Sequence, residues 1–201
     1  MQIKKLHLSI LFLACVMVGG SMVFNMAFLA PQTFTHVTLA EWVQSGSFTP
    51  VVLWPEPAGT DLSMGPLQGA GRVELYYSEQ FESGTLPVVY EFYESNKPLP
   101  IGKNVRSGIL PYYDTTSKDV ESEWVDLVLH GAERAVELRR NSNQGDAGIA
   151  IFEISGTHVV FHWKNVDQHD ALQALADGIT RVDDNDLELI SRFDQELRSS
   201  P

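Results

Sequence analysis

An uninterrupted apolar run near the start of the chain constrains the fold more than any other feature. Residues 6–30, LHLSILFLACVMVGGSMVFNMAFLA, contain no Lys, Arg, Asp or Glu. As a helix this run would be roughly 37 Å long, which exceeds the roughly 30 Å of hydrocarbon in a bilayer. The sequence therefore predicts a helix that can span a membrane.

A cleaved signal peptide is the alternative interpretation of this run. Such a peptide has a shorter apolar region, of about 7 to 15 residues, followed by small residues at the cleavage site. Here the run continues past the small residues 19–21 for another nine residues. Its end at Ala30 is flanked by the bulky Phe28 and by Pro31, which do not suit a cleavage site. We therefore favour an uncleaved anchor.

The two lysines directly before the run, at positions 4 and 5, predict its orientation. By the positive-inside rule they place residues 1–5 in the cytoplasm. We therefore expect a single-pass protein of a bacterial inner membrane, in contact with membrane lipid through residues 6–30. Residues 31–50 would form a membrane-proximal linker, and residues 51–201 a domain on the periplasmic or extracellular side.

The composition excludes several classes of protein. The formal net charge is −12, and so acidic a chain is repelled by a nucleic-acid backbone. With 44% apolar residues, the chain is too hydrophobic for a disordered protein. The single cysteine, Cys15, lies inside the apolar run, so no intrachain disulfide can form. We therefore expect a folded domain that binds no nucleic acid.

The part of the chain after the run begins with a short helix. Thr38 and Glu41 have the spacing of a capping box, which predicts a helix over about 39–44. Residues 51–54 form a candidate strand. Residues 55–71 carry three prolines and four glycines, and we expect an irregular loop there.

Alternating residues predict two strands in the next part. Residues 72–78 place Val73, Leu75 and Tyr77 on one face, the period of a half-buried strand. Residues 88–93 alternate in the same way. A further brief strand is expected near residues 105–110, within an otherwise irregular segment.

Between residues 122 and 163 the sequence predicts an antiparallel meander. Its four apolar runs cover about 122–130, 134–140, 148–154 and 157–163. Ser155-Gly156 serves as a two-residue loop that sets the register of the last two strands. This register places Ile154 opposite Thr157, Glu153 opposite His158, Phe152 opposite Val159, Ile151 opposite Val160 and Ile149 opposite His162. One face is expected in the core, and it consists of Ile154, Phe152, Val159, Phe161 and Trp163.

The chain ends in two predicted helices. Asp167 caps the first, which reaches Ile179, and Asp183 or Asp184 caps the second. The apolar stripe of the second consists of Leu187, Ile190, Phe193 and Leu197. The fold class is therefore α+β: an N-terminal transmembrane helix, followed by one antiparallel-sheet domain, a meander covered by C-terminal helices.

No motif for catalysis, for a cofactor or for a metal ion stands out, and we expect none of the three. His158 and His162 share a strand face but lie roughly 13 Å apart, too far to bind the same zinc ion directly. One of them could still form a metal site with His130 or Glu153, but we expect His158 to contact Glu153 across the hairpin. The acidic run 183–188 lacks the glycine and the final glutamate of a calcium loop.

The irregular segment 94–121 is the candidate interaction surface. Segments of this length without secondary structure are uncommon in small domains unless they serve a function or are disordered. The segment combines adjacent tyrosines with the basic residues of an otherwise acidic domain. The candidate residues are Lys97, Lys103, Arg106, Tyr112, Tyr113 and Lys118.

Three hypotheses for the function follow. The first is a non-catalytic binding or scaffold module, an accessory subunit of a larger bacterial envelope complex with a protein partner. The second is an envelope hydrolase that uses carboxylates or a single-histidine metal site. The second hypothesis requires a pocket where two or more of Glu74, Glu91, Asp126 and His130 converge. The third, a sensor ectodomain, ranks last because only a few residues precede the anchor.

Overall fold

The computed structural model describes residues 37–45, 47–65, 71–79, 87–102 and 108–200 of the chain. The predicted anchor at residues 6–30 lies outside these ranges. Within them, no helix combines the length and the apolar character that a membrane crossing requires.

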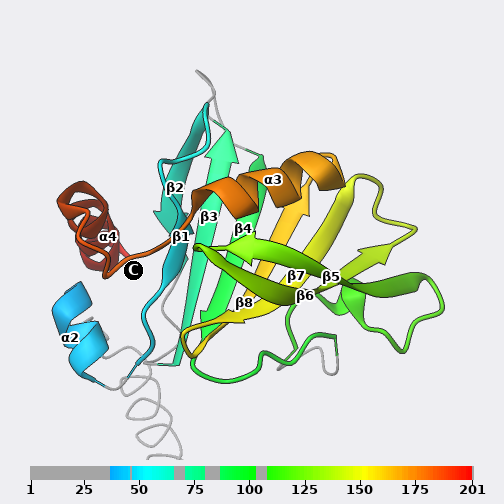
Figure 1. Cartoon of the computed structure of the whole chain (residues 1–201), viewed down its shortest axis with the longest axis horizontal. Coiled ribbons are helices and arrows are strands. Elements are labelled where there is room, and N and C mark those ends of the chain that lie inside the picture. The colour runs from blue at the N-terminus through cyan, green and yellow to red at the C-terminus, as the bar shows by residue number, and fades with distance from the viewer. Residues whose placement is uncertain (1–36, 46, 66–70, 80–86, 103–107, 201) are drawn as a thin grey trace, which may run out of the picture. The chain divides into compact units, whose positions relative to one another are not determined.

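A seven-stranded antiparallel sheet forms the centre of the described domain (Figure 1). Its strands follow the order β2-β3-β4-β8-β7-β6-β5, so that β2 and β5 are its two edges. Two short strands, β1 and β9, pair separately. The bounds are β1 Val51–Leu53, β2 Thr60–Met64, β3 Arg72–Glu79, β4 Val88–Ser95, β5 Val120–Leu129, β6 Ala132–Asn141, β7 Ala147–Ile154, β8 Thr157–Lys164 and β9 Ile179–Arg181.

Strands β5 to β8 form the predicted meander, and each pairs antiparallel with the next. Ser155 and Gly156 link β7 to β8, both with positive φ. The predicted register of this hairpin is confirmed at all five pairs, from Ile154 opposite Thr157 to Ile149 opposite His162. The coarse fold class, an α+β domain built on an antiparallel sheet, is therefore confirmed.

The main core lies on one face of the sheet and is completed by three helices, α2 (Leu39–Gln44), α3 (Gln168–Gly178) and α4 (Leu187–Ser199). All five side chains predicted for the core face of the β7–β8 hairpin are buried there. Close packing fixes Gly148, because a Cβ at this position would lie 2.4 Å from Cζ2 of Trp163. Helix α2, expected in a linker, buries Leu39 and Trp42 in this same core.

Side-chain caps determine where the helices begin. The capping box of Thr38 and Glu41 is formed, and Asp167 caps α3 as predicted. The predicted cap of the last helix is wrong, because Asp186, and neither Asp183 nor Asp184, accepts the backbone N–H groups of the first turn. Helix α4 therefore starts later. Three residues of its predicted apolar stripe, Ile190, Phe193 and Leu197, pack on the core, but Leu189 takes the place of Leu187 there. Its buried side chains are Leu189, Phe193 and Leu197, whereas Leu187 is 81% exposed.

Two short strands escaped the sequence prediction. Residues 60–64, assigned to a loop, form β2, because β3 offers an open edge and Leu62 and Met64 alternate into the core. Ile179, expected inside a helix, begins β9 and pairs with Leu53. Near residues 105–110 the described part shows only a bridge between Ile101 and Ile109 and the short 3-10 helix η2 (Pro111–Tyr113).

Candidate interaction surface

The segment between β4 and β5 folds against the second face of the sheet, which is turned away from the main core. Ile101 and Ile109 of this segment form a parallel bridge, and Tyr113 lies at the end of η2. These three side chains pack on Ile149 of β7 and Val160 of β8. A small apolar cluster of its own thus fixes the segment to the sheet.

A buried polar network centred on Glu91 lies beside this cluster. Nδ1 of His162 is 2.7 Å from Oε2 of Glu91, and the two residues are register partners on β4 and β8. Tyr93 donates its hydroxyl to the same carboxylate at 3.0 Å, and Lys164 donates to its other oxygen. Glu91 and His162 are each 5% exposed. Every oxygen of this buried carboxylate therefore has a donor.

The network sets the protonation of two of its members. Burial raises the pKa of Glu91, but hydrogen bonds to His162 and Lys164 and attraction to both side chains outweigh burial and lower the pKa to about 2. Burial and the negative charge of Glu91 raise the pKa of Tyr113 to about 12. Near neutral pH Glu91 is therefore ionised and Tyr113 keeps its proton.

Tyr113 joins this network to a second one at the edge of the sheet. Its hydroxyl lies 3.3 Å from Nε2 of His162, and its carbonyl accepts a hydrogen bond from Arg139 at 3.2 Å. Arg139 also donates to Glu137 at 2.7 Å, and Glu137 accepts from Ser122 of β5 at 3.0 Å. Polar contacts thus run from the middle of the sheet to its β5 edge.

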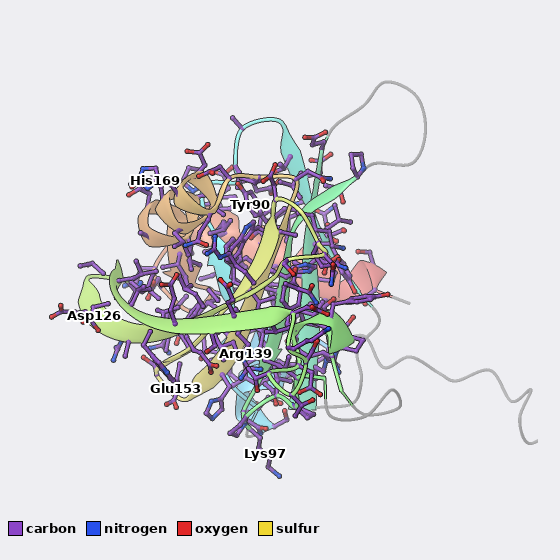
Figure 2. The ribbon with its side chains drawn as sticks, turned by 90° about the vertical axis from the view of Figure 1, so that its right-hand side faces the viewer. Tyr90, Lys97, Asp126, Arg139, Glu153 and His169 are labelled. Carbon is purple, nitrogen blue, oxygen red and sulfur yellow. The ribbon has the colours of Figure 1, made fainter. Side chains whose placement is uncertain are left out.

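The hydrolase hypothesis requires a pocket where two or more of its four residues converge. Glu74 and Glu91 lie on the same face of the neighbouring strands β3 and β4. Asp126 lies on β5, four strands away from β4, and points outward in Figure 2. His130 lies 3.6 Å from Asp184. The cavities beside β5 and α4 are lined by none of the four residues named in the hypothesis.

The predicted contact between His158 and Glu153 is confirmed. The two residues are register partners, and Nδ1 of His158 lies 3.7 Å from Oε2 of Glu153. In the part of the chain that the structure describes, no group of three His, Cys, Asp or Glu side chains could hold a metal ion.

The structure describes part of the predicted interaction surface. Lys97, Tyr112 and Lys118 are exposed, and the side chain of Lys97 extends away from the domain in Figure 2. Tyr112 is 61% exposed, whereas Tyr113 is only 1% exposed and belongs to the polar network. Of these two adjacent side chains in η2, only Tyr112 therefore remains at the surface. Lys103 and Arg106 lie outside the described residues.

Sequence reasoning missed an exposed tryptophan. Trp124 of β5 is 69% exposed, and Val128 on the same strand face is 61% exposed. No described residue pairs with the outer side of β5, which is the last strand of the sheet. Alternation in the sequence predicted this strand, but no feature of the local sequence showed that it would lie at the edge of the sheet. We call the outer side of residues 121–128 the β5 edge.

The β5 edge is acidic. Glu121, Glu123 and Asp126 are exposed on it. Arg140 of β6 lies 3.8 Å from Glu121, and both side chains are in solvent. A cavity of about 330 Å³ opens beside these residues, lined by Glu121, Ser122, Glu123, Leu138 and Arg140.

Comparisons with known proteins add no relationship to this geometry. No protein-family model matches the sequence, and no curated protein matches it.

Proposed function

We propose that the chain is a membrane-anchored, non-catalytic binding module, an accessory subunit of a larger bacterial envelope complex. Residues 6–30 tether it to the inner membrane, and the acidic domain lies on the periplasmic or extracellular side. The length of the apolar run and the two lysines before it support the tether.

The β5 edge is the observation that carries the binding function. Single exposed apolar residues are common on protein surfaces, but Trp124 stands on a ten-residue strand whose outer side has no described neighbour. A long open edge is a template for pairing with another chain. Tryptophan is also among the residues most enriched at the energetic centres of interfaces. An exposed tryptophan on an open strand edge therefore favours contact with a partner protein.

The loop surface provides a second contact in this proposal. Lys97, Tyr112 and Lys118 are exposed on the segment that the small apolar cluster fixes to the sheet. Tyr113, which is buried in the apolar cluster, would hold this surface against the sheet. Lys103 and Arg106 remain predicted members of it.

Photocrosslinking in intact cells tests the proposal. A photoreactive phenylalanine analogue replaces Trp124 in the full chain, and the same analogue replaces Gln173, an exposed residue of α3, as the matched control. We expect a discrete crosslinked product in the membrane fraction from position 124 and none from position 173. Alkaline carbonate washing should leave the chain in the membrane, and protease added outside spheroplasts should digest the domain.

Three outcomes would contradict this function. Equal crosslinking patterns at positions 124 and 173 would show that β5 is not the binding site. Release of the chain by carbonate would show that residues 6–30 do not anchor it. Protection of the domain from external protease would show that the domain does not lie outside the inner membrane.

A further inference from the structure

We propose that the β5 edge binds an extended cationic segment of the partner, which adds to the sheet as an eighth, antiparallel strand. This inference rests on the proposed binding function and specifies the chemistry of the partner. Strand addition of this kind draws affinity from main-chain hydrogen bonds and specificity from alternate side chains.

The backbone of β5 is arranged for such an addition. The two-residue turn His130-Gly131 joins Leu129 to its partner Ala132, and both turn residues have positive φ. A turn of this type closes on a hydrogen-bonded pair, and hydrogen-bonded pairs alternate along an antiparallel ladder. Odd-numbered residues of β5 therefore bond to β6. The N–H and C=O groups of residues 122, 124, 126 and 128 point to the open side.

Side chains on one face of β5 define half of the partner's pattern. Trp124 and Val128 are exposed on this face, with the exposed Asp126 between them. Opposite residues of an antiparallel pair have Cβ atoms about 5 Å apart and interact directly. An added strand therefore gains most from apolar residues opposite Trp124 and Val128 and from a cationic residue opposite Asp126.

The other face supplies the second half of the pattern. Glu121 and Glu123 line the cavity of about 330 Å³ beside the strand. The guanidinium of Arg140 lies 3.8 Å from one of these two carboxylates. A lysine or arginine of the added strand would enter the cavity and bring a positive charge to Glu123. The partner strand therefore carries basic residues on this face as well.

Charge also argues against a second copy of this chain as the occupant. Two β5 strands paired with each other would bring together Glu121, Glu123 and Asp126 from both copies. Like charges on directly paired strands are destabilising. A basic strand instead neutralises the three carboxylates.

A designed peptide tests this inference on the full chain in mild detergent. The peptide VTKVYKTK, aligned antiparallel from Val128 to Glu121, places its lysines opposite Asp126, Glu123 and Glu121. Fluorescence anisotropy measures its binding at low salt. Hydrogen exchange should show new protection of the β5 amides when the peptide is bound. A peptide with glutamate in place of lysine, VTEVYETE, should not bind.

Methylation of peptide amides separates strand addition from simple charge attraction. Methyl groups on the third and fifth amides, which face Asp126 and Trp124, should abolish binding. Methyl groups on the fourth and sixth amides, which face solvent, should leave it within about threefold. Equal affinity of both methylated peptides would overturn the inference, because it would show that no main-chain pairing occurs.

Protein variants locate the site. The triple variant Glu121→Gln, Glu123→Gln and Asp126→Asn should weaken binding about tenfold, about twofold for each exposed charge pair. The matched control has the same change of net charge at exposed positions away from β5: Asp61→Asn, Asp177→Asn and Glu188→Gln. It should bind within about twofold of the natural chain. Equal loss in both triple variants would overturn the site.

The result can be separated from that of the proposed function. Absence of peptide binding, together with crosslinking from position 124, would overturn strand addition and leave the binding module intact. The full chain could also form a dimer that the peptide fails to dissociate. If the triple variant with neutralised carboxylates forms this dimer more strongly, the edge belongs to a second copy and the inference is overturned.

Discussion

Replacing Glu91 by glutamine is the sharpest perturbation of the buried polar network. Glutamine preserves the shape of the side chain but removes the charge that His162 and Lys164 contact. A pKa lowered from 4.5 to about 2 corresponds to about 3 kcal/mol, since one pKa unit equals about 1.4 kcal/mol. Lys164 is 40% exposed, so solvent screens part of this attraction. We therefore expect the substitution to lower the free energy of unfolding by about 2 kcal/mol at pH 7.

The effect has a defined pH dependence. The pKa of Glu91 is lower in the folded state than in the unfolded state, so its ionised form stabilises the fold above the unfolded pKa of about 4.5. This stabilisation is lost as the pH falls through about 2. The difference in unfolding free energy between the natural chain and Glu91→Gln should therefore be present at pH 7 and shrink as the pH falls below 4.5.

Urea unfolding of the full chain in mild detergent, followed by tryptophan fluorescence between pH 3 and 8, measures this difference. Glu153→Gln is the matched control, because Glu153 contacts His158 at 3.7 Å at the surface. It should change the unfolding free energy by less than about 0.5 kcal/mol. A difference for Glu91→Gln below this value at pH 7, or one that does not shrink below pH 4.5, would refute the role given to the network.

Three further substitutions test other parts of the fold. Glu94 is fully buried with a raised pKa, and within the described residues one carboxylate oxygen accepts the N–H of Val51 while the other has no partner. Its protonated form stabilises the fold below about pH 4.5, and this contribution is lost as the pH rises through the raised folded pKa. The stability of the natural chain, measured by urea unfolding, should therefore decline toward alkaline pH. Glu94→Gln should flatten this decline. Gly148→Ala should lower the melting temperature by several degrees, because the new Cβ would overlap Trp163, and an unchanged melting temperature would contradict this packing. Asp186→Ala removes the cap of α4 and should lower the stability of the helix, seen as a loss of helical circular dichroism on mild heating. Asp183→Ala, which removes a cap expected from the sequence, should preserve the helix.

Local pattern was sufficient for a large part of the domain. The register of β7 and β8 could be predicted because a two-residue loop leaves adjacent strands a single favoured alignment. The caps at Thr38 and Asp167 were predictable for the same reason, since a capping side chain bonds to backbone two or three residues away. The contact of His158 with Glu153 then followed from the register.

The candidate site could not be predicted in this way, because it depends on which distant segments become neighbours. Glu91 meets His162, 71 residues further along the chain, only because β4 pairs with β8. Tyr112 and Tyr113 are identical neighbours in the chain, yet packing on Val160 buries only Tyr113. The alternation of β5 predicts a strand wherever it lies in a sheet, yet the exposure of Trp124 depends on its position at the edge. Hydrophobic period and caps act over a few residues, whereas burial and charge pairing arise between strands far apart in sequence, and here they determine which residues stay exposed on the sheet.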